Sequence, residues 1–268
     1  MKRLNLICAA VFGLLWSPAG AQSIEDAIEA RLLAGWRAPD GSHMAALQLD
    51  LAPGWNTYWR APGDAGIPPH FDWRGSQNLR SVEVEWPSPK ALKQGRHTTI
   101  GYEGRVTLPL RIRPSAAGQT VRLEGEVEIG ICREVCVPIR LDLSQALPPA
   151  KTQPDPAIVA ALASRPYTAR EAGVREVTCR LSPVPEGVKL TASITMGPLG
   201  GTEIAVVESS NPQLWVAPAQ TRRVGDTLLA ETVLQHVNGK SFAIQRSDLR
   251  ITVLGRGEAV DVQGCRAG

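Results

Sequence analysis

The sequence predicts an all-β protein of two β-sandwiches joined by a proline-rich linker that carries a short helix. Three observations support this prediction. Short runs in which apolar and polar residues alternate recur along most of the chain, as expected of half-buried strands. The 268 residues include 25 glycines, 21 prolines and seven tryptophans, but few long runs of helical periodicity. A proline-rich segment, residues 147–154, separates two groups of such strands.

Residues 1–21 have the three parts of a secretory signal peptide. Lys2 and Arg3 form the charged start, residues 4–16 the apolar centre and residues 19–21 an A-x-A cleavage site before Gln22. The apolar run is shorter than a membrane-spanning helix requires, so we expect cleavage rather than anchoring. The sequence shows no other stretch that is long and apolar enough to cross a bilayer. We therefore expect an exported protein without a membrane span of its own.

Charge and motifs exclude several function classes. With 29 basic and 26 acidic residues, the loss of Lys2 and Arg3 would leave a net charge of only +1, without basic clusters. We therefore expect no binding to nucleic acid. The sequence contains no phosphate-binding loop, nucleophile elbow or H-E-x-x-H motif.

The first sandwich is predicted at residues 22–147, with about seven short strands. Ala38-Pro39-Asp40-Gly41 is a typical turn sequence between the first two strands. Residues 54–69 bunch aromatic side chains among glycines and prolines, either as a cap on the core or as a surface that covers a site or receives a partner. Residues 90–99 are polar and without period, which predicts a loop. The strand patterns lie at 31–36, 44–51, 82–86 and 104–113, and on both sides of a turn within 121–143.

Cys132 and Cys136 lie four positions apart between the last two alternating runs. In one extended strand they would be ~13 Å apart, whereas a disulfide needs Cα atoms within about 7 Å, so the chain must turn between them. A three-residue hairpin loop, residues 133–135, would set the two cysteines opposite each other. The flanking apolar residues are odd-numbered and both cysteines even-numbered. We therefore expect both sulfurs at the tip of a hairpin, facing solvent.

The second sandwich is predicted at residues 174–268, after a linker at 148–173. Asp155 as N-cap and Pro156 at the first helical position predict a short helix that continues over 158–163. Cys179 in the first strand and Cys265 in the last would close this sandwich with a disulfide. Asn238-Gly239 is a hairpin turn signal. Strands are expected at 174–181, 188–196, 202–208, 214–216, 227–234, 241–246, 249–254 and 259–265.

The two expected disulfides differ in what they contribute to stability. Chain entropy gives ~4.6 kcal/mol for the loop closed by Cys179 and Cys265, but only ~2 kcal/mol for the loop closed by Cys132 and Cys136. We therefore expect the long bridge to be structural and the short one to carry chemistry. The second sandwich is expected to be purely structural, because nothing else in it resembles a site.

A metal site is not expected at the cysteine pair. Zinc normally takes four ligands, and none of the four histidines pairs at a close metal-ligand spacing. Copper(I) on two thiolates stays chemically reasonable. His97, in the predicted polar loop, could lie near the cysteines. The other histidines are His43, His70 and His236.

Three motifs resemble the amino-terminal periplasmic domain of the transmembrane thiol:disulfide interchange proteins of the DsbD and ScsB type. The resemblance covers roughly residues 30–145, and the two-domain layout is similar to the ScsB-like branch. The motifs are Gly54-Trp55-Asn56-Thr57-Tyr58-Trp59-Arg60 with Pro62-Gly63-Asp64, the stretch from Tyr102 to Leu110 that ends in Thr107-Leu108-Pro109-Leu110, and the stretch from Cys132 to Pro138.

The resemblance implies an immunoglobulin-like fold, a periplasmic location and a Cys132/Cys136 pair that cycles between dithiol and disulfide without a cofactor. Electrons would arrive from a membrane-embedded DsbD/CcdA-like transporter through a thioredoxin-like domain and pass to periplasmic thiol oxidoreductases. The sequence ends at Gly268 without a membrane or thioredoxin part, so we expect other proteins to supply both. The family also implies that the second cysteine, Cys136, joins partner proteins and that Cys132 resolves the adduct. Pro138, two residues after Cys136, favours the same assignment because it interrupts the strand edge.

Two departures from the better-known members concern the site. Three residues separate the cysteines instead of five, as in the ScsB-like branch. The aromatic cap loop of the family aligns near residues 93–98, which contain no aromatic residue. We therefore expect the Trp55, Tyr58 and Trp59 cluster to shield the pair or receive the partner. His97 and Tyr102 complete the residues expected at this surface.

The alternative function is a periplasmic binding module that holds copper or a protein client, with both disulfides structural. The two functions differ in the reduction potential of the Cys132–Cys136 pair. The sequence does not identify the client, nor whether the pathway serves copper tolerance, cytochrome c maturation or disulfide correction.

Overall fold

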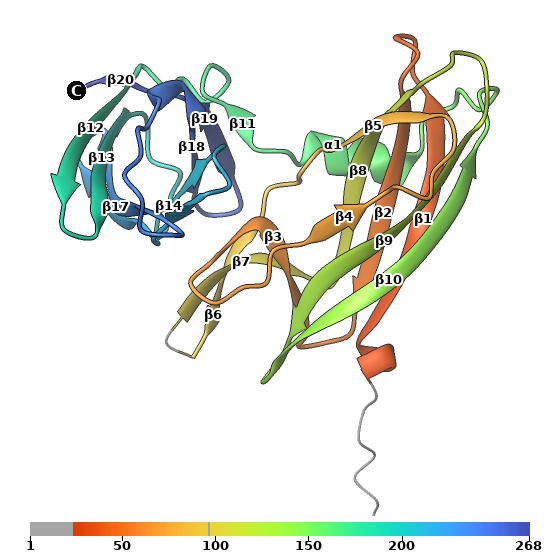
Figure 1. The fold of residues 1–268 in the computed structure, drawn as a ribbon, viewed down its shortest axis with the longest axis horizontal. Helices are drawn as coiled ribbons and strands as arrows, with labels where there is room; N and C mark the ends of the chain where they lie inside the picture. Colours follow the sequence, from red (N-terminus) through yellow and green to blue (C-terminus); the bar gives the residue numbers. More distant parts are fainter. Residues whose placement is uncertain (1–23, 96) are drawn as a thin grey trace, which may run out of the picture.

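The computed structural model describes residues 24–95 and 97–268, so the predicted signal peptide lies outside the described residues. The described chain is all-β, with immunoglobulin-like sandwiches and one short α-helix, as predicted. Figure 1 shows the first sandwich in orange to green and the second in teal to blue, with the helix between them. Among the described residues, no helix has the length and apolar character needed to span a bilayer.

The first sandwich consists of a four-stranded and a six-stranded sheet, preceded by a 3₁₀ turn, η1 (Ile24–Ala27). The four-stranded sheet has the order β1 (Ile28–Arg37), β2 (His43–Leu51), β8 (Arg105–Pro114), β5 (Leu79–Val84). The six-stranded sheet has the order β10 (Cys136–Leu147), β9 (Val121–Cys132), β3 (Asn56–Gly63), β7 (His97–Glu103), β6 (Lys90–Gln94), and β4 (His70–Asp72) also pairs with β9.

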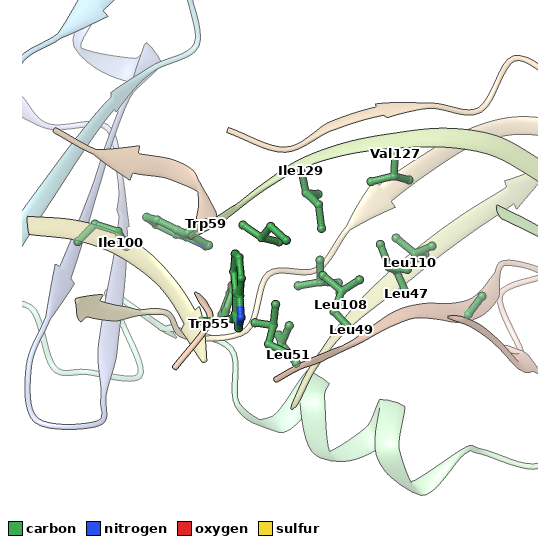
Figure 2. Packing of buried hydrophobic residues seen from close by; sticks show 14 of the residues in the cluster. Leu47, Leu49, Leu51, Trp55, Trp59, Ile100, Leu108, Leu110, Val127 and Ile129 are labelled. Atoms are coloured by element: carbon green, nitrogen blue, oxygen red, sulfur yellow. The ribbon is translucent and has the colours of Figure 1, made fainter. Parts of the chain in front are cut away.

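The core of the first sandwich confirms the alternation on β9. Its odd-numbered apolar residues, among them Val127, Ile129 and Ile131, are buried. They face the apolar side chains of β2 and β8 across the sandwich (Figure 2). Burial of this face fixes the register of β9, because a one-residue slip would turn its apolar set outward.

The predicted loop at 90–99 was wrong. These residues form the β6–β7 hairpin, in which Lys90 pairs with Gly101 and Gln94 with His97. Leu92 and Thr99 are the buried residues among the described positions of this segment, and neither belongs to the apolar core cluster, so the sequence carries a weak strand signal. The hairpin exists because β7 pairs with β3, a partner distant in the sequence. Counted over the described residues, the first sandwich has ten strands, whereas about seven were predicted.

The short helix was predicted correctly. Helix α1 (Pro156–Ala163) begins after Asp155, whose carboxylate accepts hydrogen bonds from the backbone N–H of Ala157 at 2.9 Å and of Ile158 at 3.4 Å. Ile158 is fully buried, and α1 packs against β8 and β2. The helix thus lies on the first sandwich while the chain crosses to the second.

The second sandwich also consists of two sheets. One has the order β11 (Tyr167–Thr168), β19 (Ala259–Gln263), β18 (Leu249–Leu254), β14 (Ile204–Ser209). The other has the order β15 (Leu214–Val216), β17 (Thr227–His236), β13 (Gly187–Thr195), β12 (Glu176–Val184), β20 (Arg266–Ala267), and β16 (Gln220–Val224) pairs with β17.

The strand predictions for the second sandwich missed the two-residue strands β11 and β20 and differ from the structure in three further places. Residues 241–246 form no strand; the Asn238-Gly239 turn is present, but the chain then runs irregularly into a 3₁₀ turn, η2 (Arg246–Asp248). Strand β16, which is mostly polar, was missed. Cys265 lies between β19 and β20 rather than inside the last strand.

Strand β14 joins the two sandwiches because its two faces pack on different cores. Ala205 and Val207 belong to the core of the second sandwich, whereas Val206 packs against the core of the first. Beside Val206, Glu208 accepts two hydrogen bonds from the Arg60 guanidinium, both at 2.9 Å. A groove of about 790 Å³ runs along this contact, between residues 60–68 and residues 202–221.

Candidate redox site

The two cysteines lie at the tip of the β9–β10 hairpin, directly opposite each other in the ladder. They form a disulfide with an S–S distance of 2.02 Å and a Cα–Cα distance of 4.1 Å. Residues 133–135 form the three-residue loop that the spacing predicts, and all three are exposed, Val135 to 71%. The hairpin therefore presents a closed disulfide next to an exposed loop.

The two sulfur-bearing residues differ in exposure. Cys136 is exposed at the end of β10, which is an edge strand of its sheet. Cys132 is only 2% exposed, because β3 pairs with the other side of β9 and sets Asn56 opposite Cys132. Thr57 fixes this pairing further by donating a hydrogen bond from Oγ1 to the Gly130 carbonyl at 2.8 Å.

The expectation that both sulfurs face solvent was therefore wrong for Cys132. As predicted from the alternation, Cys132 lies outside the apolar core cluster. Its outer face is nevertheless covered, because the segment that contains β3 folds over the end of β9. This cover comes from residues more than 70 positions away, which the local pattern could not reveal.

Tyr58 is the aromatic residue that contacts the disulfide. Its phenol donates a hydrogen bond to Cys136 Sγ at 3.0 Å. The buried ring lies against two glycines, since a Cβ at Gly130 or at Gly66 would come within 2.8 Å of a ring atom. Burial raises the pKa of the phenol, and a hydrogen bond with Gln94 opposes this shift. Tyr58 is therefore a protonated donor at neutral pH.

The β6–β7 hairpin also reaches the site. Gln94, at its turn, donates a hydrogen bond from Nε2 to Asn56 Oδ1 at 2.8 Å. This segment is the one that the sequence analysis, by resemblance, expected to correspond to an aromatic cap loop. In this protein it contacts the site through a side-chain amide instead of an aromatic ring.

The remaining residues of the predicted surface lie elsewhere. Trp55, Trp59 and Tyr102 belong to the buried core of the first sandwich (Figure 2 labels the two tryptophans). Tyr102 donates its hydroxyl to the Pro87 carbonyl at 2.9 Å. His97 is exposed on β7, opposite Gln94. These aromatics thus form the core cap that the sequence analysis kept as an alternative.

The rings of Trp55 and Trp59 each lie against the guanidinium of an arginine. The Arg133 guanidinium, in the loop between the cysteines, lies 5.3 Å from the Trp55 ring centre. The Arg60 guanidinium lies 3.8 Å from the Trp59 ring centre and bonds to Glu208 in the second sandwich. Trp55 is thus connected to the redox loop through Arg133.

Sequence reasoning missed Asn56, Gln94 and Gly130 as site residues. Asn56 lies inside the Gly54–Arg60 motif, but its position next to Cys132 follows only from the β3–β9 pairing. Gly130 was a visible signal, because a glycine inside a strand marks a close approach by another chain segment. Gln94 lies in the segment predicted as a loop, and nothing in its own sequence context pointed to the site.

The second disulfide joins Cys179 of β12 to Cys265, with a Cα–Cα distance of 5.7 Å. Cys179 is fully buried in the core of the second sandwich, and its carbonyl accepts a hydrogen bond from Arg246 Nε at 3.0 Å. The disulfide therefore connects β12 with the segment that leads to β20. In the described residues, no group of three or more histidine, cysteine, aspartate or glutamate side chains could hold a metal ion.

Comparison with known families now adds to this geometry. Residues 29–148 match the family model described as thiol:disulfide interchange protein DsbD, N-terminal. Residues 29–148 form a DsbD N-terminal-like domain. The DsbD N-terminal-like domain contains Cys132, Cys136, Tyr58, Asn56 and Gln94. The resemblance inferred from the sequence motifs is thereby confirmed for the first sandwich.

A solved structure extends the similarity in fold to the second sandwich. The N-terminal periplasmic domain of ScsB from Proteus mirabilis superposes with a TM-score of 0.65 and 22% sequence identity. The alignment covers 90% of this chain and 92% of that chain. The solved structure therefore has a similar fold over both sandwiches. No curated protein sequence matched the chain.

Proposed function

We propose that the chain is a periplasmic thiol–disulfide exchange protein. It would accept reducing equivalents from a membrane-embedded electron transporter, through a thioredoxin-like domain, and pass them to periplasmic oxidoreductases. The observation that carries the proposal is the asymmetry of the hairpin disulfide, which joins an exposed Cys136 to a buried Cys132. In a disulfide of this kind, a partner can attack the exposed sulfur, and the buried sulfur is the leaving group.

Exchange at this site requires two steps. A thiolate of a reduced partner attacks Cys136 Sγ; a mixed disulfide forms, the Cys132–Cys136 bond breaks, and its electron pair stays on Cys132 as a thiolate. The partner's second thiolate then attacks its own sulfur of the mixed disulfide and releases the Cys136 thiolate. The partner leaves oxidised by two electrons and the hairpin pair is reduced. Passing the electrons on to an oxidised client reverses these steps.

Three features favour Cys136 as the exchanging thiol. It is exposed, it begins the edge strand β10, and Pro138 two residues later is also exposed. The Tyr58 hydroxyl would donate to a Cys136 thiolate as it donates to the sulfur in the disulfide. Hydrogen bonds to a charged acceptor are the stronger ones, so Tyr58 would stabilise the thiolate that leaves in the second step.

The location and the domain roles are also part of the proposal. The solved relative is named as a periplasmic domain, and its fold covers both sandwiches. We propose residues 22–147 as the redox domain, 148–173 as the linker and 174–268 as a structural domain that its own disulfide closes. A signal peptide at residues 1–21 would direct export.

Trapping of the mixed disulfide tests the exchange. A thioredoxin-like partner that lacks its own resolving cysteine, and whose remaining cysteine is held as a mixed disulfide with thionitrobenzoate, would be mixed with Cys132→Ala and, separately, with Cys136→Ala; attack by the free thiol releases thionitrobenzoate as the leaving thiolate. Cys132→Ala, which keeps Cys136, should accumulate the mixed disulfide. Accumulation with Cys136→Ala instead would reverse the two roles.

The reduction potential of the pair tests the function as a whole. A relay pair should equilibrate with thioredoxin-like couples, whereas structural disulfides lie below about −300 mV. A potential in the structural range would reject the relay. It would favour a binding module for copper or a protein client, with both disulfides structural.

A further inference from the structure

We infer that the side-chain amide of Asn56 donates a hydrogen bond to the Cys132 thiolate that forms when the disulfide opens. This inference rests on the proposed function, because attack on Cys136 makes Cys132 the leaving group. It assigns Asn56 a part in the reaction that neither the family match nor the solved relative states.

The need for a donor follows from burial. Cys132 is 2% exposed, so a thiolate formed there has little access to water. A buried anion without a hydrogen-bond donor is costly, and this cost would slow the opening of the disulfide. The exposed Cys136 has the Tyr58 hydroxyl as a donor, whereas no side-chain hydrogen bond reaches Cys132 within the described part of the chain.

The ladder places Asn56 next to Cys132. The two residues are directly opposite in the antiparallel β3–β9 pair. Side chains of opposed residues lie on the same face with Cβ atoms about 5 Å apart. Tyr58, two residues along β3, shares this face and reaches Cys136 Sγ, which shows that the face carries the sulfurs.

The amide has an unused donor. Asn56 is 7% exposed, and its Nδ2 is buried without a hydrogen-bond partner in the described part of the chain. Its Oδ1 accepts from Gln94, which fixes the orientation of the amide. Buried donors are almost always paired, so an exception needs an explanation. The inference explains this exception: the Asn56 N–H has no acceptor while the disulfide is closed, and it donates to Cys132 once the thiolate forms.

The chemical consequence concerns the first exchange step. A thiol of lower pKa is a better leaving group, so a hydrogen bond to the Cys132 thiolate speeds attack on Cys136. The donor is already in place before the charge appears and does not have to reorganise. Asn56 therefore acts on the leaving sulfur, as Tyr58 acts on the attacked one.

Titration of a single thiol tests the contact without a partner protein. In a Cys136→Ala background that begins at Gln22, with the Cys179–Cys265 bridge intact, Cys132 is the one free thiol of residues 22–268, and its thiolate is followed by ultraviolet absorbance. Asn56→Leu removes the donor, and Asn56→Asp keeps an acceptor for Gln94 but sets a carboxylate beside the sulfur. The pKa of Cys132 should rise in Asn56→Leu and rise further in Asn56→Asp. An unchanged pKa in both variants overturns the inference.

Kinetics test the consequence and separate it from the proposed function. Reduction of the intact disulfide by a reduced thioredoxin-like protein should slow about tenfold in Asn56→Leu, the effect of one hydrogen bond to a charged group. Equal rates for wild type and both variants overturn the role of Asn56 while leaving the relay intact. A wild-type disulfide that no such partner reduces, together with the expected pKa shifts, rejects the relay and keeps the Asn56 contact.

Two further variants control for general effects on folding. Trp59→Phe removes another buried N–H that lacks a partner in the described residues, within the core of the same sandwich, and should leave the pKa of Cys132 unchanged. Gln94→Leu leaves Asn56 in place but releases its orientation, so it should slow reduction less than Asn56→Leu does. If Trp59→Phe raises the pKa of Cys132 as much as Asn56→Leu does, the effect is structural and the inference fails.

Discussion

The phenol of Tyr58 donates a hydrogen bond to Cys136 Sγ at 3.0 Å, across 78 positions of sequence. This contact joins β3 to the exposed half of the disulfide. The first prediction concerns the loss of this hydrogen bond. In Tyr58→Phe the ring keeps its packing while the Cys136 thiolate loses its donor, so exchange should slow about tenfold. Stopped-flow measurement of reduction by a thioredoxin-like protein would show the change.

Tyr102→Phe is the matched control for the first prediction. Tyr102 is also buried and also donates its hydroxyl, but to the Pro87 carbonyl, away from the cysteines. Its loss should lower the free energy of unfolding by about 1 kcal/mol and leave the exchange rate unchanged. Similar exchange rates for Tyr58→Phe and wild type would contradict the role of the Tyr58 contact.

Gly130→Ala should disturb the packing of the Tyr58 ring beside the disulfide. The added Cβ would lie 2.6 Å from the Ile67 Cβ and 2.8 Å from the Tyr58 ring. Relief of this overlap must displace the ring that bonds to Cys136, so exchange should slow and stability should fall by about 1–3 kcal/mol. Gly197→Ala, where a Cβ would have no neighbour within 4 Å, should leave exchange unchanged. Wild-type exchange and stability in Gly130→Ala would show that this packing is not needed.

Glu208→Gln should loosen the contact between the sandwiches. The Arg60 and Glu208 side chains are only 15% and 19% exposed, so removal of the carboxylate leaves a largely buried guanidinium without its ion pair. We expect a loss of about 3 kcal/mol in thermal or urea unfolding. Glu171→Gln, which breaks an exposed pair with Arg165, should have little effect. Equal losses in the two variants would contradict the distinction between buried and exposed pairs.

Cys179→Ala combined with Cys265→Ala should separate stability from exchange. Loss of this bridge should lower the free energy of unfolding by a few kcal/mol, because it closes a long loop. Exchange at Cys136 should stay nearly unchanged, because the bridge lies in the other sandwich. Denaturant unfolding and exchange kinetics on the same sample check both parts. If exchange stops while the first sandwich remains folded, the second sandwich is more than structural.

Glu203 should make stability depend on pH. Hydrogen bonds from Arg223 lower its pKa below the ordinary value of 4.5, against the opposing effect of burial. A carboxylate with a depressed pKa in the folded state stabilises the protein above its ordinary pKa, and this contribution is lost as pH falls through the folded value. The stability difference between wild type and Glu203→Gln should therefore shrink as pH falls below about 5. Parallel pH curves for the two proteins would contradict the ion pair's contribution.

Local patterns in the sequence predicted the elements that depend on neighbours in the chain. The alternation around Cys132 and Cys136 predicted the hairpin and its register, and Asp155 with Pro156 predicted the start of the helix. These features follow from side-chain periodicity and capping, which need only a few adjacent residues.

The features that failed depend on distant pairing. The burial of Cys132 arises because Asn56 pairs with it across 76 positions, and the β6–β7 hairpin exists because β7 pairs with β3. Trp55 and Trp59 were expected at a surface because aromatics among glycines and prolines fit a cap on a site as well as a cap on a core, and Tyr102 was expected at the same surface. Only the direction of each side chain on β3 and β7 distinguishes the two.

Three consecutive residues of β3 contact three different parts of the protein: Tyr58 the disulfide, Trp59 the core and Arg60 the second sandwich. The smallest transplantable version of the site is therefore discontinuous. A synthetic peptide of residues 121–147 would hold both cysteines but neither Tyr58 nor the cover of Cys132. An approaching thiol would therefore have similar access to both sulfurs. A scaffold that is to receive the hairpin needs β3 in the same register, because an insertion of one residue before Tyr58 would turn its ring into the core.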